Sequence, residues 1–273
     1  SSASKDNILH LKSFSSLINN LFMKSSRVLE VGCNDGTLLE LLDNFGFIVL
    51  GIDPAKNMNT LPIHKKLNTT FQSFGLSSVD LLLKNNNQEK FDCIFGLNVF
   101  AHFSNVMESF IAIKKLLKND GFFIFEVAYA FDTIFSGIYD TVYHEHVFNH
   151  SVVGLKNMLN AADLKILGIN KLNTQGGSIR VFVGKKHFNK DTSIQNNVFP
   201  ELLNFEINKG IQGNLFIKNI SRKITHSIDS IKNLTRTFIE NKNEQCFLLG
   251  APARGVVIAN TCGFDFFHNL IVI

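Results

Sequence analysis

VLEVGCNDG, residues 28–36, joins a short apolar run to a stretch with helical periodicity. Residues 27–31 have the composition of a buried strand, and TLLELLDNFG after them predicts a helix that ends at Gly46. Gly32 and Gly36 let the backbone turn tightly between the two elements and approach a ligand closely. A strand, a glycine turn and a helix in this order indicate a parallel sheet that binds a nucleotide at the carboxyl ends of its strands.

The alternation of strands and helices extends to both sides of this unit. Apolar residues recur at three- and four-residue steps in residues 5–22, which predicts an opening helix that packs on the sheet. Further strands are predicted at 47–54, 69–74, 91–100, 121–127, 164–172 and 178–186, and further helices at 76–86, 105–121 and 151–162. Seven strands with interleaved helices predict one doubly wound, Rossmann-like α/β domain over residues 1–186.

The remaining residues predict a second, smaller unit. Residues 187–199 are polar and form an expected linker. Residues 200–242 predict one long or broken helix, with Gly210 and Gly213 as interruption points. CFLLGAPARGVVIANTCGF, residues 246–264, repeats the strand, glycine turn and helix, and LIVI, residues 270–273, predicts an apolar strand. Residues 200–273 are therefore expected to be part of a second Rossmann-like unit that something else completes.

Composition limits the classes of function. Hydrophobic residues make up 45% of the 273 residues and charged residues 18%, which is the balance of a globular protein. The longest apolar runs are too short to cross a bilayer and no signal sequence opens the chain, so a cytoplasmic location is expected. Four scattered cysteines predict neither a disulfide framework nor a zinc knuckle. A net charge of +4 without a basic block argues against nucleic acid as a partner but tolerates an anionic small molecule.

Acidic residues around the glycine turn indicate the kind of nucleotide. Glu30 and Asp35 supply hydrogen-bond acceptors rather than room for phosphate, and the turn is not a G-x-G-x-x-G loop. Asp53 closes the next strand 23 positions after Glu30, where a carboxylate can accept both hydroxyls of a ribose. An adenosine without phosphates is the expected ligand; a dinucleotide-binding turn and a purely structural turn are the alternatives.

This pattern, E-x-G-x-x-x-G followed by an acid at the end of the next strand, resembles the S-adenosylmethionine site of class I methyltransferases. The resemblance implies that S-adenosylmethionine is the cofactor, with Glu30, Gly32 and Gly36 facing its methionine portion and Asp53 its ribose. The cofactor-binding set expected from the resemblance is Glu30, Gly32, Asn34, Asp35, Gly36, Asp53, Asn98 and Phe100.

Four later segments resemble a narrower family. NVFAHFSN (98–105), FEVAYAFDTIFSGIYDTVYHEHVFNHS (125–151), NTQGGSIRVFV (173–183) and LLGAPARGVVIANTCGF (248–264) are similar to blocks of the C-methyltransferases that act on nucleotide-linked deoxy-keto sugars. The resemblance covers roughly residues 25–265 and implies methyl transfer to a carbon beside a ketone. That family usually begins with a cysteine-rich zinc domain, and no such cysteines precede Cys33.

The most specific block is YDTVYHEHVFNH, residues 139–150, called here the histidine segment. The resemblance implies that Tyr143, Glu145 and His146 are catalytic and that His102 faces them. Histidine is suited to taking a proton near neutral pH, which favours His146 as the base, with Glu145 fixing its tautomer or holding substrate. A metal site built from His144 and His146 on one strand face, with a third histidine, is an alternative, as is a polar loop without chemistry.

The expected substrate contacts come from two glycine turns. The resemblance implies that Gln175 and Ser178 line a sugar pocket, although the family often has histidine where this chain has Gln175. Arg180 is expected either to meet a phosphate or to cap the sheet edge, and Arg254 either to hold an anion or to pack between units. The expected partner is a nucleotide sugar, without metal, membrane or nucleic acid. Methyl transfer to oxygen or nitrogen, and a binding module without activity, are the alternative functions.

Overall fold

The computed structural model describes residues 4–61, 63, 66–174, 176–190, 194–242, 246–248, 252–263 and 270–272. The chain divides into two compact units. The sheet unit contains residues 1–127, 154–171 and 179–199, and the C-terminal unit contains residues 128–153, 172–178 and 200–273. The segment expected as a linker, 187–199, is thus part of the sheet unit, and the histidine segment groups with the C-terminal residues.

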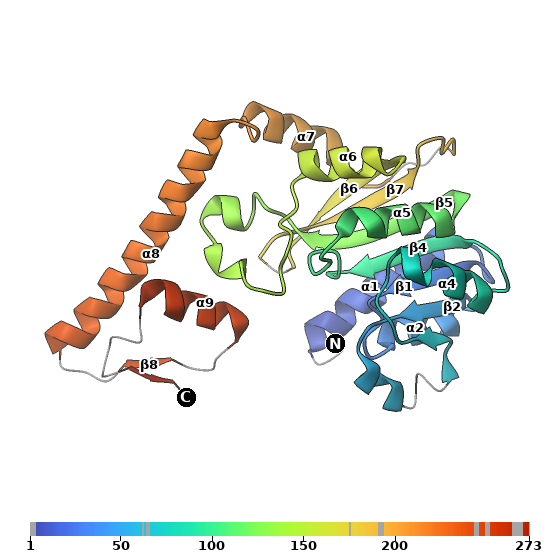
Figure 1. The fold of residues 1–273 in the computed structure, drawn as a ribbon, viewed down its shortest axis with the longest axis horizontal. Helices are drawn as coiled ribbons and strands as arrows, with labels where there is room; N and C mark the ends of the chain where they lie inside the picture. Colours follow the sequence, from blue (N-terminus) through green and yellow to red (C-terminus); the bar gives the residue numbers. More distant parts are fainter. Residues whose placement is uncertain are drawn as a thin grey trace. The chain divides into compact units, whose positions relative to one another are not determined.

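A seven-stranded sheet forms the centre of the sheet unit, as the sequence predicts (Figure 1). Its strands are β1 (Arg27–Val31), β2 (Ile48–Ile52), β3 (Thr69–Thr70), β4 (Phe91–Leu97), β5 (Leu117–Ala128), β6 (Leu164–Leu172) and β7 (Ser178–Lys185), in the order β3-β2-β1-β4-β5-β7-β6. β1 pairs in parallel with both β2 and β4. The chain reverses its direction of winding between β1 and β4, and this is the point at which such sheets bind ligands.

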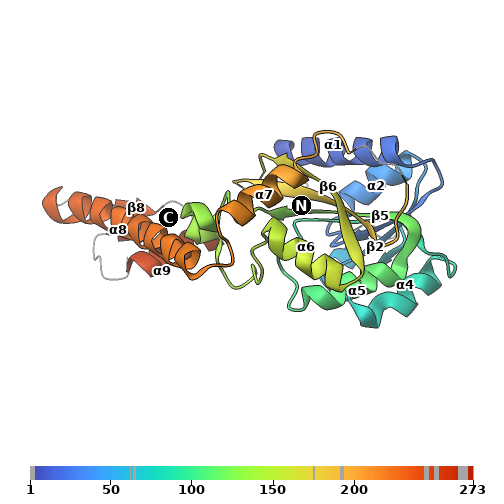
Figure 2. The same ribbon diagram turned by 90° about the horizontal axis from the view of Figure 1, so that it is seen from above.

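Helices cover both faces of the sheet. They are α1 (Lys5–Leu21), α2 (Thr37–Asn44), α4 (Val79–Asn85), α5 (Val106–Leu116) and α6 (Val152–Ala161). Figure 2 shows α1 and α2 on one face and α4 and α5 on the other. Phe14 and Ile18 of α1 are fully buried in the first layer, and Phe110 of α5 packs on Phe123 and Phe125 of β5 in the second. Burial of these apolar faces is the main stabilising term.

Two predicted boundaries differ from the structure. The helix expected at 105–121 ends at Leu116, because Leu117 is buried and pairs with Phe91 at the start of β5. The strand expected at 69–74 shrinks to Thr69–Thr70, which pair with the end of β2. Both differences lie at element ends, where local pattern is least informative.

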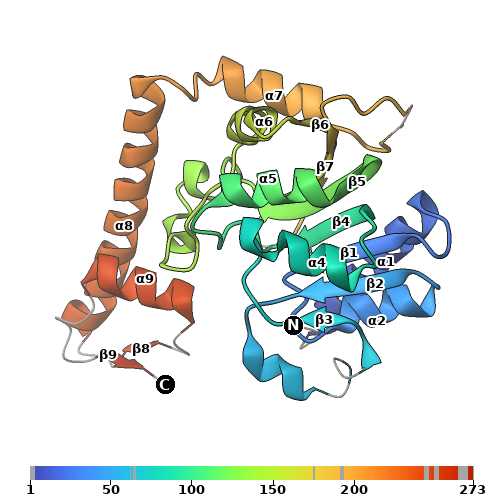
Figure 3. The same ribbon diagram turned by 45° about the vertical axis from the view of Figure 1, so that its right-hand side comes forward.

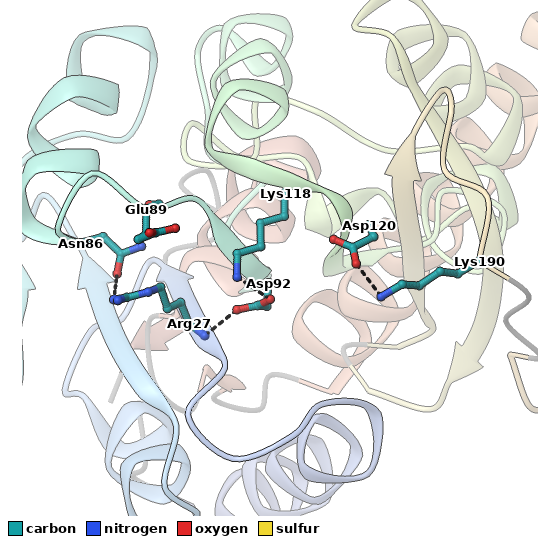
Figure 4. Close-up of polar contacts among 7 residues, drawn as sticks. All are labelled: Arg27, Asn86, Glu89, Asp92, Lys118, Asp120 and Lys190. Atoms are coloured by element: carbon teal, nitrogen blue, oxygen red, sulfur yellow. Dashed lines mark hydrogen bonds and ion pairs between the residues drawn. The ribbon is translucent and has the colours of Figure 1, made fainter.

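Charged side chains gather where β1, β4 and β5 begin (Figure 4). Asp92 of β4 accepts hydrogen bonds from the backbone N–H of Arg27 at 2.8 Å and from Lys118 Nζ at 2.8 Å. Arg27 also donates to Asn86 at 3.1 Å. Because these strands are parallel, this network occupies the edge opposite their carboxyl ends.

The C-terminal unit contains α7 (Phe199–Asn208), α8 (Asn214–Lys242), β8 (Cys246–Leu248), α9 (Ala253–Cys262) and β9 (Leu270–Val272). The predicted break between two helices occurs at Gly210, which has φ of +67°. β8 and β9 pair in parallel, so the strand expected at the end of the sequence pairs within this unit. Figure 3 shows α9 beside α8, and Cys262 Sγ lies 4.0 Å from the Ile228 carbonyl oxygen. Among the helices described, none has the length and apolarity that a membrane crossing requires.

Candidate functional site

The turn after β1 is held by a carboxylate from the end of β2. Asp53 accepts hydrogen bonds from the backbone N–H of Asn34 at 2.9 Å and of Ala55 at 2.8 Å. Gly32 has φ of +79°, and a Cβ atom there would lie 2.9 Å from Val99 Cγ2. Glycine is therefore required at this position both by its backbone conformation and by its neighbour. The structure thus brings Gly32, Asn34 and Asp53 together, as the sequence predicts.

The rest of the turn begins α2. Gly36 occupies the N-cap with φ of +76°, and Asp35 Oδ1 accepts a hydrogen bond from Thr37 N–H at 3.2 Å. Asp35 thus satisfies a backbone donor at the helix start. Its carboxylate also raises the pKa of Glu30.

Glu30 is a buried carboxylate, and one of its two oxygens receives no hydrogen bond from the described residues. Its side chain lies at the end of β1, only 6% of the residue is exposed, and within the described part of the chain Oε2 has no hydrogen-bond partner. Burial, followed by the charges of Asp35 and Asp53, raises the pKa of Glu30 well above its usual value. A buried acceptor without a donor costs roughly 1–3 kcal/mol, so a cationic donor placed beside Glu30 would be stabilised.

A cavity of about 240 Å³ opens at the carboxyl ends of β1, β2 and β4. It is lined by Val31, Gly32, Ile52, Pro54, Ser73, Phe74, Val99, His102, Phe103 and Ser104. Its walls are mostly apolar, which suits the rings of a nucleoside. Sequence reasoning identified Gly32 and His102 but missed Phe74 and Phe103, which stand 6.2 Å apart between ring centroids.

The two residues expected after β4 have different surroundings. Asn98 has φ of +55°, and its N–H donates to the Glu126 carbonyl oxygen at 2.9 Å, which shapes the loop that carries Val99 and His102. Phe100 is completely buried and stacks on Phe103 with ring centroids 5.2 Å apart. It supports the cavity wall from the core and does not line the cavity.

Two side chains of the histidine segment form a close polar pair. Tyr143 Oη lies 2.9 Å from His146 Nε2, and His146 Nδ1 lies 3.0 Å from the Thr141 carbonyl oxygen. A carbonyl oxygen only accepts, so Nδ1 carries a proton in this contact. In the neutral imidazole Nε2 is then the basic nitrogen, and it accepts a hydrogen bond from the Tyr143 hydroxyl. The backbone carbonyl of Thr141 therefore sets the tautomer that a general base needs.

Glu145 is an exposed residue of the histidine segment. Its side chain is 62% exposed, and its Oε1 lies 3.8 Å from Nε2 of His144, whose side chain is 85% exposed. Burial, followed by the charge of Glu145, raises the pKa of Tyr143, and the charge of Arg254 opposes this effect. The segment forms no strand around His144 and His146, so the strand face on which a metal alternative depends is absent from these described residues, and no group of three potential ligands occurs among them.

The start of the histidine segment is anchored by α9. Arg254 donates from Nε to Asp140 Oδ2 at 2.9 Å and from Nη2 to Asp140 Oδ1 at 3.1 Å. Tyr139 Oη lies 3.3 Å from Thr261 Oγ1 and 3.7 Å from Cys262 Sγ. Arg254, expected either to hold an anion or to pack between units, contacts a carboxylate of its own chain.

The end of the segment is anchored by α7. Glu206 is completely buried, and its two carboxylate oxygens accept the N–H groups of Val152 and Val153 at 2.7 Å each. These donors open α6, so Glu206 caps that helix from a distant part of the sequence. Burial, followed by Glu206, raises the pKa of Tyr129. Sequence reasoning missed Glu206; the signal was an acid inside the apolar pattern of ELLNFEIN, five positions after Glu201 at its start.

The remaining expected substrate residues have internal partners. Arg180 is 8% exposed; its Nε donates to Glu126 Oε1 at 2.7 Å, and its Nη2 forms an ion pair with the same oxygen at 2.6 Å. Ser178 is completely buried and donates to the Thr174 carbonyl oxygen at 3.0 Å. Gln175 lies outside the described residues. His102 belongs to the sheet unit and His146 to the C-terminal unit.

Comparison with known proteins agrees with this architecture. A family model described as a methyltransferase domain matches residues 9–168. The C-methyltransferase NovU of Streptomyces niveus is 25% identical over 239 residues, which cover 86% of this chain and 55% of NovU. A ubiquinone biosynthesis O-methyltransferase of Pelagibacter ubique is 27% identical over 151 residues, which cover 55% of this chain and 60% of that protein. The chain thus spans less than two thirds of either relative's length.

Solved structures show the same fold. Magnesium protoporphyrin IX methyltransferase from Synechocystis, crystallised with bound SAH, superposes with a TM-score of 0.50 and is 16% identical. The superposition covers 66% of this chain and 83% of that protein.

Proposed function

Because the chain belongs to the methyltransferase domain family and is an S-adenosylmethionine-dependent methyltransferase, we propose that its acceptor is a carbon beside the ketone of a nucleotide-linked keto-deoxysugar. The share of the chain that each similarity covers supports carbon as the acceptor. The similarity to a C-methyltransferase extends over 86% of this chain, whereas the similarity to the Pelagibacter O-methyltransferase covers 55%. The longer match leaves only 14% of the chain unmatched, so it includes most of the C-terminal unit.

The observation that carries the proposal is the hydrogen-bonded pair of Tyr143 and His146. His146 is held with Nδ1–H on a backbone carbonyl, so Nε2 is ready to accept a proton from the sugar carbon. When it does so, the Tyr143 hydroxyl is released from Nε2 and can donate to the ketone oxygen, which takes up the negative charge of the enolate. The Thr141 carbonyl then stabilises the Nδ1–H of the imidazolium. When bound, S-adenosylmethionine would supply the methyl group for the new carbon–carbon bond. Its sulfur–methyl bond would break, and S-adenosylhomocysteine would be the second product.

The residues around β1 fit the proposed cofactor. Glu30 offers an unpaired, buried carboxylate oxygen to the ammonium group of the methionine portion. Each oxygen of Asp53 accepts one backbone N–H and keeps a further acceptor site for a ribose hydroxyl. We assign these two carboxylates to cofactor binding, with Gly32 allowing the close approach of the backbone.

Replacement of Glu30 tests this assignment. Glu30→Gln should weaken S-adenosylmethionine binding by roughly 10- to 100-fold, because a hydrogen bond to a charged group contributes about 1.5–3 kcal/mol. The raised pKa of Glu30 adds a second expectation. As the pH falls through that pKa the carboxylate takes a proton and its attraction for the ammonium group is lost, so the wild-type affinity should fall while the variant's should not.

Titration calorimetry at a series of pH values from acidic to neutral measures both effects in the full chain. Glu40→Gln, which changes an exposed acid of α2, is the matched control and should bind like the wild type. Equal loss of affinity in both variants, or a wild-type pH dependence in Glu30→Gln, would contradict the role of Glu30.

The reaction itself is tested with the full chain, S-adenosylmethionine and a panel of 4-keto-deoxysugar nucleotides. The product should be heavier by one methyl group, with the new methyl on carbon by NMR. Without the cofactor, a sugar nucleotide in heavy water should exchange the proton of that carbon for deuterium, since deprotonation by His146 precedes methyl transfer. Methylation on oxygen would favour the O-methyltransferase alternative, and cofactor binding without exchange would favour a binding module.

A further inference from the structure

We propose that Asp140 and Arg254 are positioning residues, an ion pair through which α9 holds Thr141, His146 and Tyr143 in their working arrangement. This inference rests on the proposed function, because it assigns a role toward the base of that reaction. It differs from both roles expected for Arg254 from the sequence, which were to hold an anion or to pack between units.

The argument begins with the place of Asp140 in the chain. It lies in the short 3-10 helix Tyr139–Thr141, between the anchored Tyr139 and the carbonyl group that accepts His146 Nδ1–H. Any displacement of Asp140 therefore moves the acceptor that sets the tautomer of His146. A shift of about 1 Å in such an acceptor can reduce a rate by roughly 100-fold.

The geometry of the ion pair suits a positioning role. Two parallel hydrogen bonds of 2.9 and 3.1 Å join Asp140 and Arg254, and such a fork fixes orientation as well as distance. The side chain of Asp140 is 16% exposed and that of Arg254 48% exposed, so water reaches the guanidinium more than the carboxylate. Bidentate pairs of an arginine with a carboxylate hold their geometry better than ordinary surface ion pairs.

A second contact with α9 fixes the orientation of the 3-10 helix Tyr139–Thr141 as well as its position. Tyr139 Oη reaches Thr261 and Cys262 in the last turn of α9, whereas Arg254 is in its first turn. Cys262 and Tyr139 are both buried. The 3-10 helix is therefore held at two points along α9, and it cannot pivot about either one alone.

Arg254 also acts through its charge. It is the cation that opposes the rise in the pKa of Tyr143, a rise caused by burial and by Glu145. The charged and titratable groups around the Tyr143 hydroxyl are thus Glu145, Arg254 and the imidazole of His146. A nearby positive charge makes the phenol a stronger donor, which favours the negative oxygen of an enolate.

Two roles for Arg254 give different results in a double-mutant cycle. We would compare Asp140→Asn, Arg254→Gln and the double variant in the full chain, measuring kcat, KM for the sugar nucleotide and Kd for S-adenosylmethionine. If the pair positions the base, each single variant should lower kcat by roughly 10- to 100-fold, the double variant should be no worse, and KM and Kd should change little. Asp163→Asn, which breaks the exposed 2.6 Å pair with Lys114 in the sheet unit, is the control and should match the wild type.

The opposite pattern would assign Arg254 to the substrate. If its guanidinium binds a phosphate, Arg254→Gln should raise KM by tenfold or more while Asp140→Asn leaves kcat unchanged. That result, or losses in kcat that multiply in the double variant, would overturn the proposal.

A spectroscopic readout separates this inference from the proposed function. The chain has three tyrosines and no tryptophan, so the absorbance change of Tyr143 on ionisation can be isolated by subtracting the titration of Tyr143→Phe. In the resting protein Arg254→Gln should move the ionisation of Tyr143 to higher pH. Arg254→Lys should bring it most of the way back to the wild-type pH, and Asp163→Asn should leave it unchanged. If Tyr143 ionises at the same pH in Arg254→Gln as in the wild type, the proposal is contradicted, even if catalysis is normal. Absence of methyl transfer from every variant and the wild type would instead refute the proposed function.

Discussion

His146→Gln is expected to lower kcat by roughly 10²- to 10⁴-fold, the usual contribution of general acid–base catalysis. The side-chain amide of glutamine can still donate to the Thr141 carbonyl and accept from the Tyr143 hydroxyl, so the polar contacts of this pair have a replacement. It has no basic nitrogen, however, and cannot accept the proton from the sugar carbon. Binding of S-adenosylmethionine should therefore stay within about twofold of the wild type, since His146 is not among the residues assigned to cofactor binding.

Single-turnover kinetics and deuterium exchange measure this loss directly. His144→Gln is the matched control, because it makes the same substitution two positions earlier at a side chain that is 85% exposed. The control should keep wild-type exchange and turnover. Full activity in His146→Gln would remove this residue as the base, and an equal loss in both variants would point to a general effect on the segment.

The second large effect is on stability: Arg180→Leu should reduce the free energy of unfolding by about 3–5 kcal/mol. Glu126 is completely buried, and Arg180 donates a hydrogen bond from Nε and forms an ion pair through Nη2 with its Oε1. Leucine would remove this cation and leave the His10 imidazole, 2.6 Å from Oε2, as the partner that the structure records for the Glu126 side chain. The guanidinium also lies 5.1 Å from the ring centre of Phe14, a contact that would be lost as well.

Urea unfolding of the full chain measures this change. Lys114→Leu, which breaks an exposed ion pair, should cost no more than about 1 kcal/mol and serves as the control. The double variant Arg180→Leu/Glu126→Leu should recover part of the loss, because it removes the buried charge together with its partner. Unchanged stability in Arg180→Leu, with a raised KM for the nucleotide sugar, would return Arg180 to the substrate-binding role that the sequence suggested.

Much of the sheet unit could be predicted because its signals are local. Apolar periodicity and glycine positions indicated β1, α2 and β2 to within a few residues. The break near Gly210 was also predictable, since glycine interrupts helices by its own conformational freedom, and so were the strand Cys246–Leu248 and the helix Ala253–Cys262. These predictions needed only neighbours in sequence.

The candidate catalytic pair was predictable by type but not by arrangement. Tyr143 and His146 were expected as a group, and the sequence offered Glu145, next to His146, as the residue that orients the imidazole. The structure adds a contact that the sequence did not suggest, between His146 Nδ1 and the Thr141 carbonyl oxygen. Every residue has a backbone carbonyl group, so the sequence does not indicate which carbonyl accepts a hydrogen bond from a side chain.

The sequence by itself determined the order of the elements, the glycine turn after β1 and the residue types available for chemistry, because periodicity and backbone preference act over a few residues. Only the tertiary structure decided which charges meet. Arg254 and Asp140 are 114 positions apart, and Glu206 lies 54 positions from the Val152 N–H that it accepts. Such pairs form because a buried or half-buried charge needs an opposite charge or a donor wherever the folded chain places one, and that requirement has no local pattern.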